Sequence, residues 1–248
     1  MKISYPEFKK MKSVTPIAML TAYTTPVARC LEKAEIPIIL VGDTVGMVEM
    51  GFSSTQFVTL DHMKYHIGAV RRGAPNTHII GDMPYRSDTD KETALSNAKQ
   101  LIQAGADSIK LEGPKYEIIE YLVNNEIPVV GHTGLTPQTA KSFKQVGQSQ
   151  AEADRIMEES KGIERSGSFL IVLEHIPSKL GALITKSLAI PTIGIGAGSE
   201  CDGQVLVIND AIGVGDKWPP FSKQYAQVSK IIVSAVKEYK EQVESGIF

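Results

Sequence analysis

The chain has 248 residues, of which 42% are hydrophobic and 22% are charged, and its formal net charge at pH 7 is −2. This length suits either two small domains or one large α/β barrel. Acidic and basic residues are interleaved, which excludes the charge pattern typical of proteins that bind nucleic acid or an anionic membrane.

The amino-terminal residues indicate no export signal. Residues 1–13 mix Lys, Glu, Tyr and Pro and lack the apolar core of a signal peptide. No apolar run approaches the length that crosses a bilayer. The two cysteines, Cys30 and Cys201, are isolated and match no metal-binding or redox spacing. We therefore expect a soluble, cytoplasmic protein in a reducing compartment, with no nucleic-acid or membrane partner.

Apolar runs alternate with helical patterns from one end of the chain to the other. The runs are rich in β-branched residues and lack in–out alternation, which is typical of strands covered on both faces. Eight strands are predicted, at residues 16–21, 37–42, 77–81, 107–112, 127–131, 168–174, 191–195 and 204–208.

Three helices have clear sequence signals. Residues 91–104 place their apolar side chains on one face. A helix over 149–166 begins with Ser149 as its N-cap and stops at Gly167. A last helix, over about 222–244, carries one apolar stripe.

This alternation of eight strands with helices, without an internal linker, predicts an α/β fold: a (β/α)8 TIM barrel in a single domain over residues 1–248. An N-terminal extension over about 1–14 precedes the barrel, and the C-terminal helix follows it. A doubly wound open sheet is the alternative, and the number of strands argues against it. The long connections at about 43–60 and 132–148 would lie at the catalytic face of a barrel and could act as lids.

Acidic residues end four of the predicted strands: Asp43, Asp82, Glu112 and Glu174. The carboxyl ends of barrel strands face one shared site, so these side chains should gather at one rim. The same rule brings further residues to that rim, namely Thr21, Tyr23, Thr44, Lys110, His132 and the glycine turn Gly194–Gly198. Carboxylates gathered in this way bind a hard cation or move protons.

Asp43 and Asp82 come from neighbouring strands and are short oxygen donors of the kind that Mg²⁺ takes together with water and substrate oxygens. With Glu112 on the next strand, we predict a divalent-metal site. The alternative is that each aspartate only caps the helix that follows it. Lys110 and Glu112 share one strand face. They form an internal salt bridge, or the lysine holds a substrate carboxylate while the glutamate supports the metal.

Glu174 follows an apolar run, and apolar surroundings favour a carboxylate that acts as a general base near neutral pH. Its alternative is a buried acid paired with a Lys or His. His132 is either structural or catalytic. The turn at 194–198 lacks the spacing of a phosphate-binding loop, and close backbone approach explains it equally well.

These residues fit a metal that chelates a 2-oxo acid, so that a base can form the enolate, which then attacks a carbon electrophile. Residue spacing does not name that electrophile.

Several short stretches carry a resemblance to a known family. They are 20–23 (LTAY), 41–43 (VGD), 54–55 (ST) with 58–60 (VTL), 110–113 (KLEG), 131–132 (GH) with 134–138 (GLTPQ), 173–174 (LE), and 193–198 (IGIGAG) with 201–207 (CDGQVLV). In this order they resemble the ketopantoate hydroxymethyltransferase family, and the resemblance runs from about residue 15 to 225.

The resemblance implies a Mg²⁺-dependent (β/α)8 barrel related to the phosphoenolpyruvate mutase and isocitrate lyase group. The implied reaction moves a one-carbon unit from 5,10-methylenetetrahydrofolate to 3-methyl-2-oxobutanoate. Its product, 2-dehydropantoate, belongs to pantothenate synthesis and the route to coenzyme A. The resemblance also implies a large homo-oligomer, such as the decamer frequent in the family.

By the same resemblance, Asp43 and Asp82 would bind the metal and contact the substrate, with Glu112 nearby or joined through water. Lys110 and the hydroxyl of Thr44 would hold the carboxylate of the oxo acid. The resemblance does not indicate which residues bind the folate.

The proton-abstracting base would be Glu174, and His132 would line the pocket near the new hydroxymethyl group. The chain departs from the family pattern at the barrel mouth. The departures are Thr44 for Ser, Thr24 for Asp, Phe57 for Pro, Pro114 for Gly, and the reordered residues 145–147. They leave the metal and base positions intact but bear on substrate size and loop closure, so a related 2-oxo acid stays open.

Two other functions stay open at this point. One is a folate-independent lyase or mutase of the same barrel superfamily that acts on another 2-oxo acid. The other is a catalytically silent barrel that serves as an oligomeric binding or scaffold protein. The intact Asp43, Asp82, Lys110 and Glu174 argue against the silent barrel.

Overall fold

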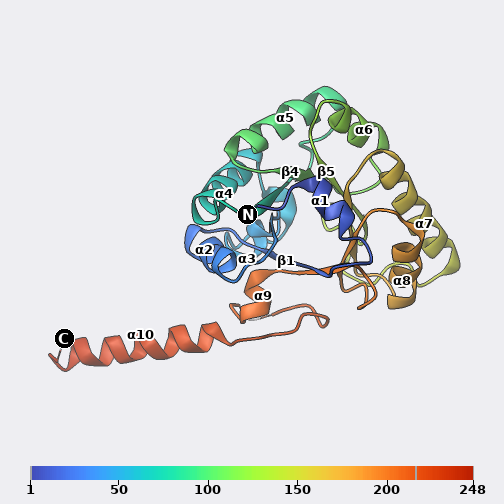
Figure 1. Ribbon diagram of the computed structural model, residues 1–248. Coiled ribbons are helices and arrows are strands. Elements are labelled where there is room, and N and C mark those ends of the chain that lie inside the picture. Colours follow the sequence, from blue (N-terminus) through green and yellow to red (C-terminus); the bar gives the residue numbers. More distant parts are fainter. Residues whose placement is uncertain (1, 216, 248) are drawn as a thin grey trace. The chain divides into compact units, whose positions relative to one another are not determined.

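The computed structural model describes residues 2–215 and 217–247. Eight parallel strands form a closed barrel in chain order, with helices around the outside of the strands (Figure 1). The strands are β1 (Ile17–Thr21), β2 (Ile38–Val41), β3 (His78–Asp82), β4 (Ser108–Lys110), β5 (Val129–Gly134), β6 (Leu170–Glu174), β7 (Thr192–Ile195) and β8 (Gly203–Leu206). The eight predicted strands and the TIM barrel are confirmed, and closure of the sheet excludes the doubly wound alternative.

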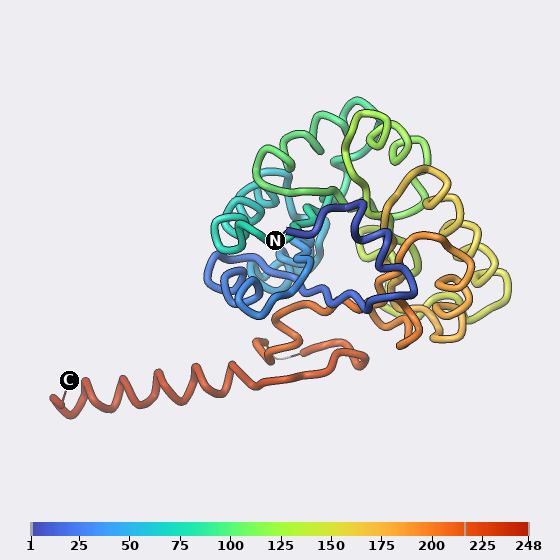
Figure 2. Tube along the Cα trace, in the orientation of Figure 1, coloured from blue at the N-terminus to red at the C-terminus, as the bar shows by residue number. Residues whose placement is uncertain are grey.

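The helices follow the strands along the chain, whose path can be traced in Figure 2. They are α1 (Tyr5–Lys10), α2 (Thr25–Lys33), α3 (Val45–Val48), α4 (Leu60–Gly73), α5 (Lys91–Ala104), α6 (Tyr116–Asn124), α7 (Gln150–Arg165), α8 (Ser178–Ser187), α9 (Ile208–Ile212) and α10 (Val228–Glu244), with a 3-10 helix, η1 (Thr55–Phe57). Helix α5 has the predicted bounds, and α1 lies within the segment predicted as an N-terminal extension.

Local hydrogen bonds explain where two of these helices begin. At α7, Glu152 N–H donates to Ser149 Oγ, and the Glu152 carboxylate accepts from Ser149 N–H, each at 3.3 Å, so the predicted N-cap is confirmed as a capping box. Helix α10 begins at Val228, later than the predicted residue 222, because backbone hydrogen bonds hold the preceding segment against α9 and its C-cap. One of these runs from Tyr225 N–H to Ala211 O at 2.7 Å.

The predicted series of strand–helix units is wrong at one place, because residues 196–202, between β7 and β8, form a turn segment without a helix. Gly196 and Gly198 both have positive φ, at 62° and 92°, which favours glycine. A Cβ on Gly198 would lie 2.4 Å from Ser178 Cβ. Positive φ therefore favours glycine at both positions, and close approach to Ser178 requires it at Gly198.

The barrel core is filled from the strands and closed by the N-terminal helix. Every residue of β2, β3, β4 and β5 is buried, as predicted for strands covered on both faces. Phe8 of α1 joins the core cluster that contains Ile17, Ile38, Phe169 and their neighbours. Burial of a side chain of this size contributes roughly 2–3 kcal/mol to stability.

The chain divides into two compact units, Met1–Val205 and Leu206–Phe248. The first holds α1 to α8 and β1 to β7, and the second holds α9 and α10. The assignment of all 248 residues to one domain stays a prediction. Among the described residues, no helix combines the length and apolar character needed to cross a membrane.

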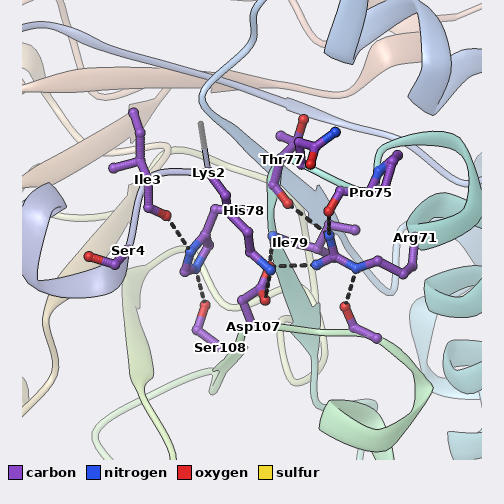
Figure 3. A network of polar contacts seen from close by, with 12 residues as sticks. Lys2, Ile3, Ser4, Arg71, Pro75, Thr77, His78, Ile79, Asp107 and Ser108 are labelled. Atoms are coloured by element: carbon purple, nitrogen blue, oxygen red, sulfur yellow. Dashed lines mark hydrogen bonds and ion pairs between the residues drawn. The ribbon is translucent and has the colours of Figure 1, made fainter.

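A polar network lies at the amino ends of β3 and β4, where His78 is buried (Figure 3). His78 Nδ1 donates to the Ile3 carbonyl at 3.2 Å, and Nε2 accepts from the Ser108 hydroxyl at 2.9 Å. Burial lowers the pKa of His78 to about 4, although the carboxylate of Asp107 acts in the opposite direction. With its pKa lowered this far, the imidazole is neutral at pH 7, so Nε2 accepts while Nδ1 donates.

Asp107 is the charged centre of the same network. It forms ion pairs with Lys2 and with Arg71, the latter at 2.5 Å, and it accepts from Ile79 N–H at 2.9 Å. Burial by itself would raise the pKa of Asp107, but these partners outweigh burial and lower it. The network joins the N-terminal segment, α4 and the starts of two strands.

The buried His78 should make stability depend on pH. As the pH falls from 6.5, the ordinary pKa, toward about 4, the unfolded chain takes up a proton that the folded chain does not. Between pH 7 and pH 5 the free energy of unfolding should therefore fall by about 2 kcal/mol more in the wild type than in His78→Gln. Urea denaturation at both pH values measures the difference, and equal falls in the two proteins would contradict it.

Candidate active site

The carboxyl ends of the strands bring the predicted site residues together. Asp43 follows β2, Asp82 ends β3, and Glu112 lies just beyond β4, and these three residues are 5%, 2% and 6% exposed. Glu174 ends β6, and its side chain is 19% exposed. The rim therefore holds three buried carboxylates and one that solvent reaches.

Lys110 is the buried cation of this cluster. Its Nζ lies 2.7 Å from Asp82 Oδ1, and the two residues are register partners on β4 and β3. Burial by itself would lower the pKa of Lys110, but the carboxylates of Asp82, Asp43 and Glu112 outweigh burial and raise it. Lys110 is therefore an ammonium ion. It forms its ion pair with Asp82, whereas one of the two sequence-based predictions was a salt bridge with Glu112.

Neither aspartate caps a helix. The N-cap of α3 is Thr44, and the N-cap of α5 is Asp90, whose carboxylate accepts from Thr93 N–H at 2.8 Å. Asp43 N–H instead donates to Asp82 Oδ2 at 3.3 Å. The alternative that Asp43 and Asp82 serve only as caps is wrong.

Gln138 connects the acids and was missed by sequence reasoning. It is 3% exposed, and its Nε2 donates to Asp43 Oδ2 and to Met83 O, each at 2.9 Å. Its backbone N–H donates to Glu112 Oε1 at 3.0 Å. Its carbonyl accepts from Gln56 Nε2 at 2.6 Å, which joins the two long connections at the barrel mouth. The only signal in the sequence was its place in the stretch GLTPQ.

The cluster contains more carboxylate than cation. Burial and the neighbouring Asp82 raise the pKa of Asp43 to about 7. Burial also raises the pKa of Glu112 to about 9, with Asp43 and Glu174 adding to the effect and Lys110 opposing it. Both shifts mean that a further positive charge at this rim, from a proton or a metal ion, would be stabilised.

The donor set fits a hard divalent cation held by two carboxylates. In the part of the chain that the structure describes, no group of three or more His, Cys, Asp or Glu side chains is arranged to hold a metal. Asp43 Oδ2 and both oxygens of Asp82 accept hydrogen bonds, and Asp43 Oδ1 is left without a donor among the described residues. Mg²⁺ is commonly held by one or two carboxylates, with water and substrate completing its shell.

His132 lies between two acids. Its Nδ1 is 3.6 Å from Glu112 Oε2, and its Nε2 is 3.3 Å from Glu174 Oε2. The side chain is buried, and both ring nitrogens lack a hydrogen bond among the described residues. Buried polar atoms without partners are uncommon and mark a place where a further group is accommodated.

Gly134 fixes the position of Glu174 on the neighbouring strand. The two residues are register partners, and Leu135 N–H donates to Glu174 O at 2.8 Å. Gly134 has φ of 99°, and a Cβ there would lie 2.3 Å from Glu174 O. Only glycine lets β5 approach the end of β6 this closely.

The hydroxyl of Thr44, which the family pattern places near the substrate carboxylate, is held by Tyr23. Its Oγ1 lies 2.7 Å from the Tyr23 hydroxyl, and burial raises the pKa of Tyr23, so the phenol keeps its proton. The other departures lie farther out. Thr24 is the N-cap of α2, and Phe57 is 58% exposed.

A cavity of about 760 Å³ borders the acid cluster, and we call it the side cavity. Glu112 and Gln138 line it, and so do Pro114 and Val146, two of the positions where the chain departs from the family pattern. Its remaining walls come from the segments that follow β3, β4 and β5 and from α6 and α7. The side cavity therefore has room for a molecule beside the carboxylates.

The fold and the site define a TIM barrel with a buried carboxylate–lysine cluster at the carboxyl ends of its strands. The sequence profile described as ketopantoate hydroxymethyltransferase matches residues 2–248, and the chain belongs to this family. It is 45% identical over 256 residues to the 3-methyl-2-oxobutanoate hydroxymethyltransferase of Heliobacterium modesticaldum, covering 100% of this chain and 93% of that protein. The predicted family and its enzyme class, the transferases, are confirmed.

Solved structures agree on the fold. Phosphoenolpyruvate phosphomutase from Streptomyces platensis subsp. rosaceus has a TM-score of 0.65 at 11% identity, covering 98% of this chain and 88% of that one. A phosphonopyruvate hydrolase complex with oxalate and Mg²⁺ has a TM-score of 0.66 at 12% identity, with the same coverage of 98% and 88%. The predicted relation to the phosphoenolpyruvate mutase and isocitrate lyase barrels is confirmed at the level of fold.

Proposed function

We propose that this protein transfers a hydroxymethyl group to 3-methyl-2-oxobutanoate, with 5,10-methylenetetrahydrofolate as donor and Mg²⁺ as cofactor, in pantothenate synthesis. The observation that carries the proposal is the buried pair Asp43 and Asp82 with Lys110 on Asp82, in a chain of the hydroxymethyltransferase family. The predicted cytoplasmic location is part of the proposal, and the two free cysteines support it.

Asp43 and Asp82 would hold the metal, with Glu112 joined through water. The phosphonopyruvate hydrolase of the same fold binds Mg²⁺ together with oxalate, whose paired oxygens resemble the carboxylate and carbonyl of a 2-oxo acid. The bound metal would supply Lewis acidity at the carbonyl oxygen of the substrate. The raised pKa of Asp43 supports this assignment, because a nearby cation stabilises a buried carboxylate.

Other side chains would bind the substrate and remove its proton. The ammonium of Lys110 and the hydroxyl of Thr44 bind the substrate carboxylate. Glu174, the most exposed of the acids, takes the proton from C3 of the oxo acid. The carbanion equivalent left at C3 forms the new bond to the methylene carbon of the folate. That carbon is bonded to two nitrogens in the donor, and one carbon–nitrogen bond breaks as the new carbon–carbon bond forms. Water then replaces the second nitrogen and supplies the hydroxyl oxygen of the product. Tetrahydrofolate leaves, and its two nitrogens take up the proton from C3 and the proton from water.

His132 supports the base. Its Nε2 lies 3.3 Å from Glu174 Oε2, so the imidazole can pass on or hold the proton that Glu174 has taken. Its other nitrogen faces Glu112 at 3.6 Å. His132 thus lies beside the place where the new hydroxymethyl group forms.

The proposed reaction is tested by measuring 2-dehydropantoate. The purified protein should form it from 3-methyl-2-oxobutanoate and 5,10-methylenetetrahydrofolate, lose the activity when EDTA removes divalent metal, and regain it with MgCl₂. Activity unchanged by EDTA would contradict the metal assignment. Carbon–carbon bond chemistry on a 2-oxo acid without the folate would favour a lyase or mutase. A protein that binds neither Mg²⁺ nor the oxo acid in calorimetry would be the silent scaffold.

Glu174 is tested by proton exchange without the folate. In D₂O with Mg²⁺, the wild type should exchange the C3 proton of 3-methyl-2-oxobutanoate, and Glu174→Gln should slow this exchange by at least about 10²-fold. Binding of the oxo acid should be retained, because the substitution keeps the shape of the side chain. Glu120→Gln, on the exposed face of α6, is the matched control. Normal exchange in Glu174→Gln would remove this residue from the base role.

We also propose that the protein is a homo-oligomer whose subunits contact one another through α10. This helix has no buried residue, and its exposed apolar side chains include Ile231 at 64%, Ile232 at 50%, Val236 at 58% and Tyr239 at 56%. An apolar stripe of this kind marks a protein–protein contact. The large assembly implied by the family, such as a decamer, would cover it.

Sedimentation velocity measures the assembly. The wild type should sediment as a species larger than the monomer, and Ile232→Asp combined with Val236→Asp should shift it to smaller species, because charges oppose burial of the stripe. Lys237→Asp, on the same helix, is the control for an added acid. A wild type that stays monomeric at micromolar concentration would contradict the proposal.

A further inference from the structure

The side cavity is connected to the acid cluster through shared residues. Glu112 and Gln138 line the cavity, and Gln138 Nε2 also donates to Asp43 Oδ2 at 2.9 Å. Asp43, Lys110, His132 and Glu174 do not line it. A molecule in the side cavity would therefore lie next to the oxo acid's site without occupying the carboxylates themselves.

The cavity is larger than a five-carbon oxo acid requires and falls within the range of about 300–1,000 Å³ typical of sites for larger ligands. Its walls combine apolar groups, from Ile118, Leu135 and Val146, with four cationic side chains: Arg86, Lys115, Lys141 and Arg155. Such walls suit a ligand that carries both apolar and anionic groups.

Two of the four cations are neutralised by acids of the protein. Lys115 Nζ lies 2.5 Å from Asp88 Oδ2, and Arg155 Nη1 lies 2.5 Å from Glu159 Oε1. Asp88 is buried, and its carboxylate pairs with Lys115 at the cavity wall. These two ion pairs are part of the cavity wall, and the paired cations offer little net positive charge to a ligand.

Arg86 and Lys141 have no acidic partner in the part of the chain that the structure describes. Both are exposed, so their charges lie where the cavity meets solvent. Arg86 has φ of 62°, unusual for a residue with a side chain, and its guanidinium lies 5.1 Å from the centre of the Tyr85 ring. Such backbone conformations are concentrated at ligand-binding positions.

We propose that the side cavity binds the folate donor, with Arg86 and Lys141 holding the carboxylates of its glutamate tail; this assignment rests on the proposed function. The reactive methylene belongs to the pteridine end, which must reach the oxo acid, so that end lies at Glu112 and Gln138. The benzoyl ring then crosses the apolar walls. The tail, at the opposite end of the molecule, meets the two cations that lack acidic partners.

The test compares two donors in two proteins. One donor is 5,10-methylenetetrahydrofolate, and the other is an analogue whose benzoylglutamate is replaced by an uncharged methylphenyl group. The double variant Arg86→Gln, Lys141→Gln should raise KM for the intact donor by about tenfold, since two exposed ion pairs are lost. KM for the uncharged analogue and KM for the oxo acid should not change. Lys186→Gln, an exposed lysine of α8, is the matched control.

Three results overturn the assignment: an unchanged KM for the intact donor, an equal rise for both donors, or the same rise in Lys186→Gln. Failure of the proposed function is recognised separately, because the wild type would then form no 2-dehydropantoate with either donor. Folding of the double variant is monitored by C3 proton exchange of the oxo acid without the donor, which should equal that of the wild type.

Discussion

The site depends on an imbalance of charge: Asp43, Asp82 and Glu112 are buried around one ammonium ion, that of Lys110. Burial of unmatched carboxylate is unfavourable, and it raises the pKa of Asp43 to about 7 and that of Glu112 to about 9. The closed barrel tolerates this because its strands are fixed by their register and by apolar packing beneath the rim. A further positive charge at the rim would offset part of this unfavourable burial.

The loops at the barrel mouth take part in that balance through Gln138. Its amide stabilises the charged form of Asp43, and its backbone holds Glu112, although the residue itself lies on a long connection. Gln56 from the other long connection donates to the Gln138 carbonyl. Movement of either connection would therefore change the hydrogen bonds of Asp43 and Glu112. If these segments act as lids, as predicted, their movement would change the protonation of the carboxylates as well as the access of substrate to the site.

Sequence patterns predicted the strands and helix ends, because local interactions determine these features. Continuous apolar runs located the eight strands, and the acids at their ends followed because a strand ends where its apolar run ends. Ser149 located the start of α7 because a cap is a local hydrogen bond. Long-range partners were not predictable: Gln138 and Asp43 are 95 positions apart, and the partner of Lys110 is Asp82, on the next strand, instead of the nearer Glu112. The turn without a helix after β7 likewise contains a long-range contact, that of Gly198 with Ser178.

Apart from Thr24, which stands where the family pattern has Asp, the departures from that pattern change the shape of side chains and not their charge. Thr44 keeps the hydroxyl of the usual serine, and Tyr23 fixes that hydroxyl at 2.7 Å, so the added methyl changes volume beside Asp43 without removing a hydrogen bond. Pro114 and Val146 line the side cavity, which Glu112 also lines. One methylene in a pocket changes selection by about 1–3 kcal/mol, whereas removal of a buried charge partner costs about 3–5 kcal/mol. Substitutions at these positions would therefore change selection among branched 2-oxo acids at a smaller cost in free energy than substitutions of the buried charged residues, which the family pattern shares.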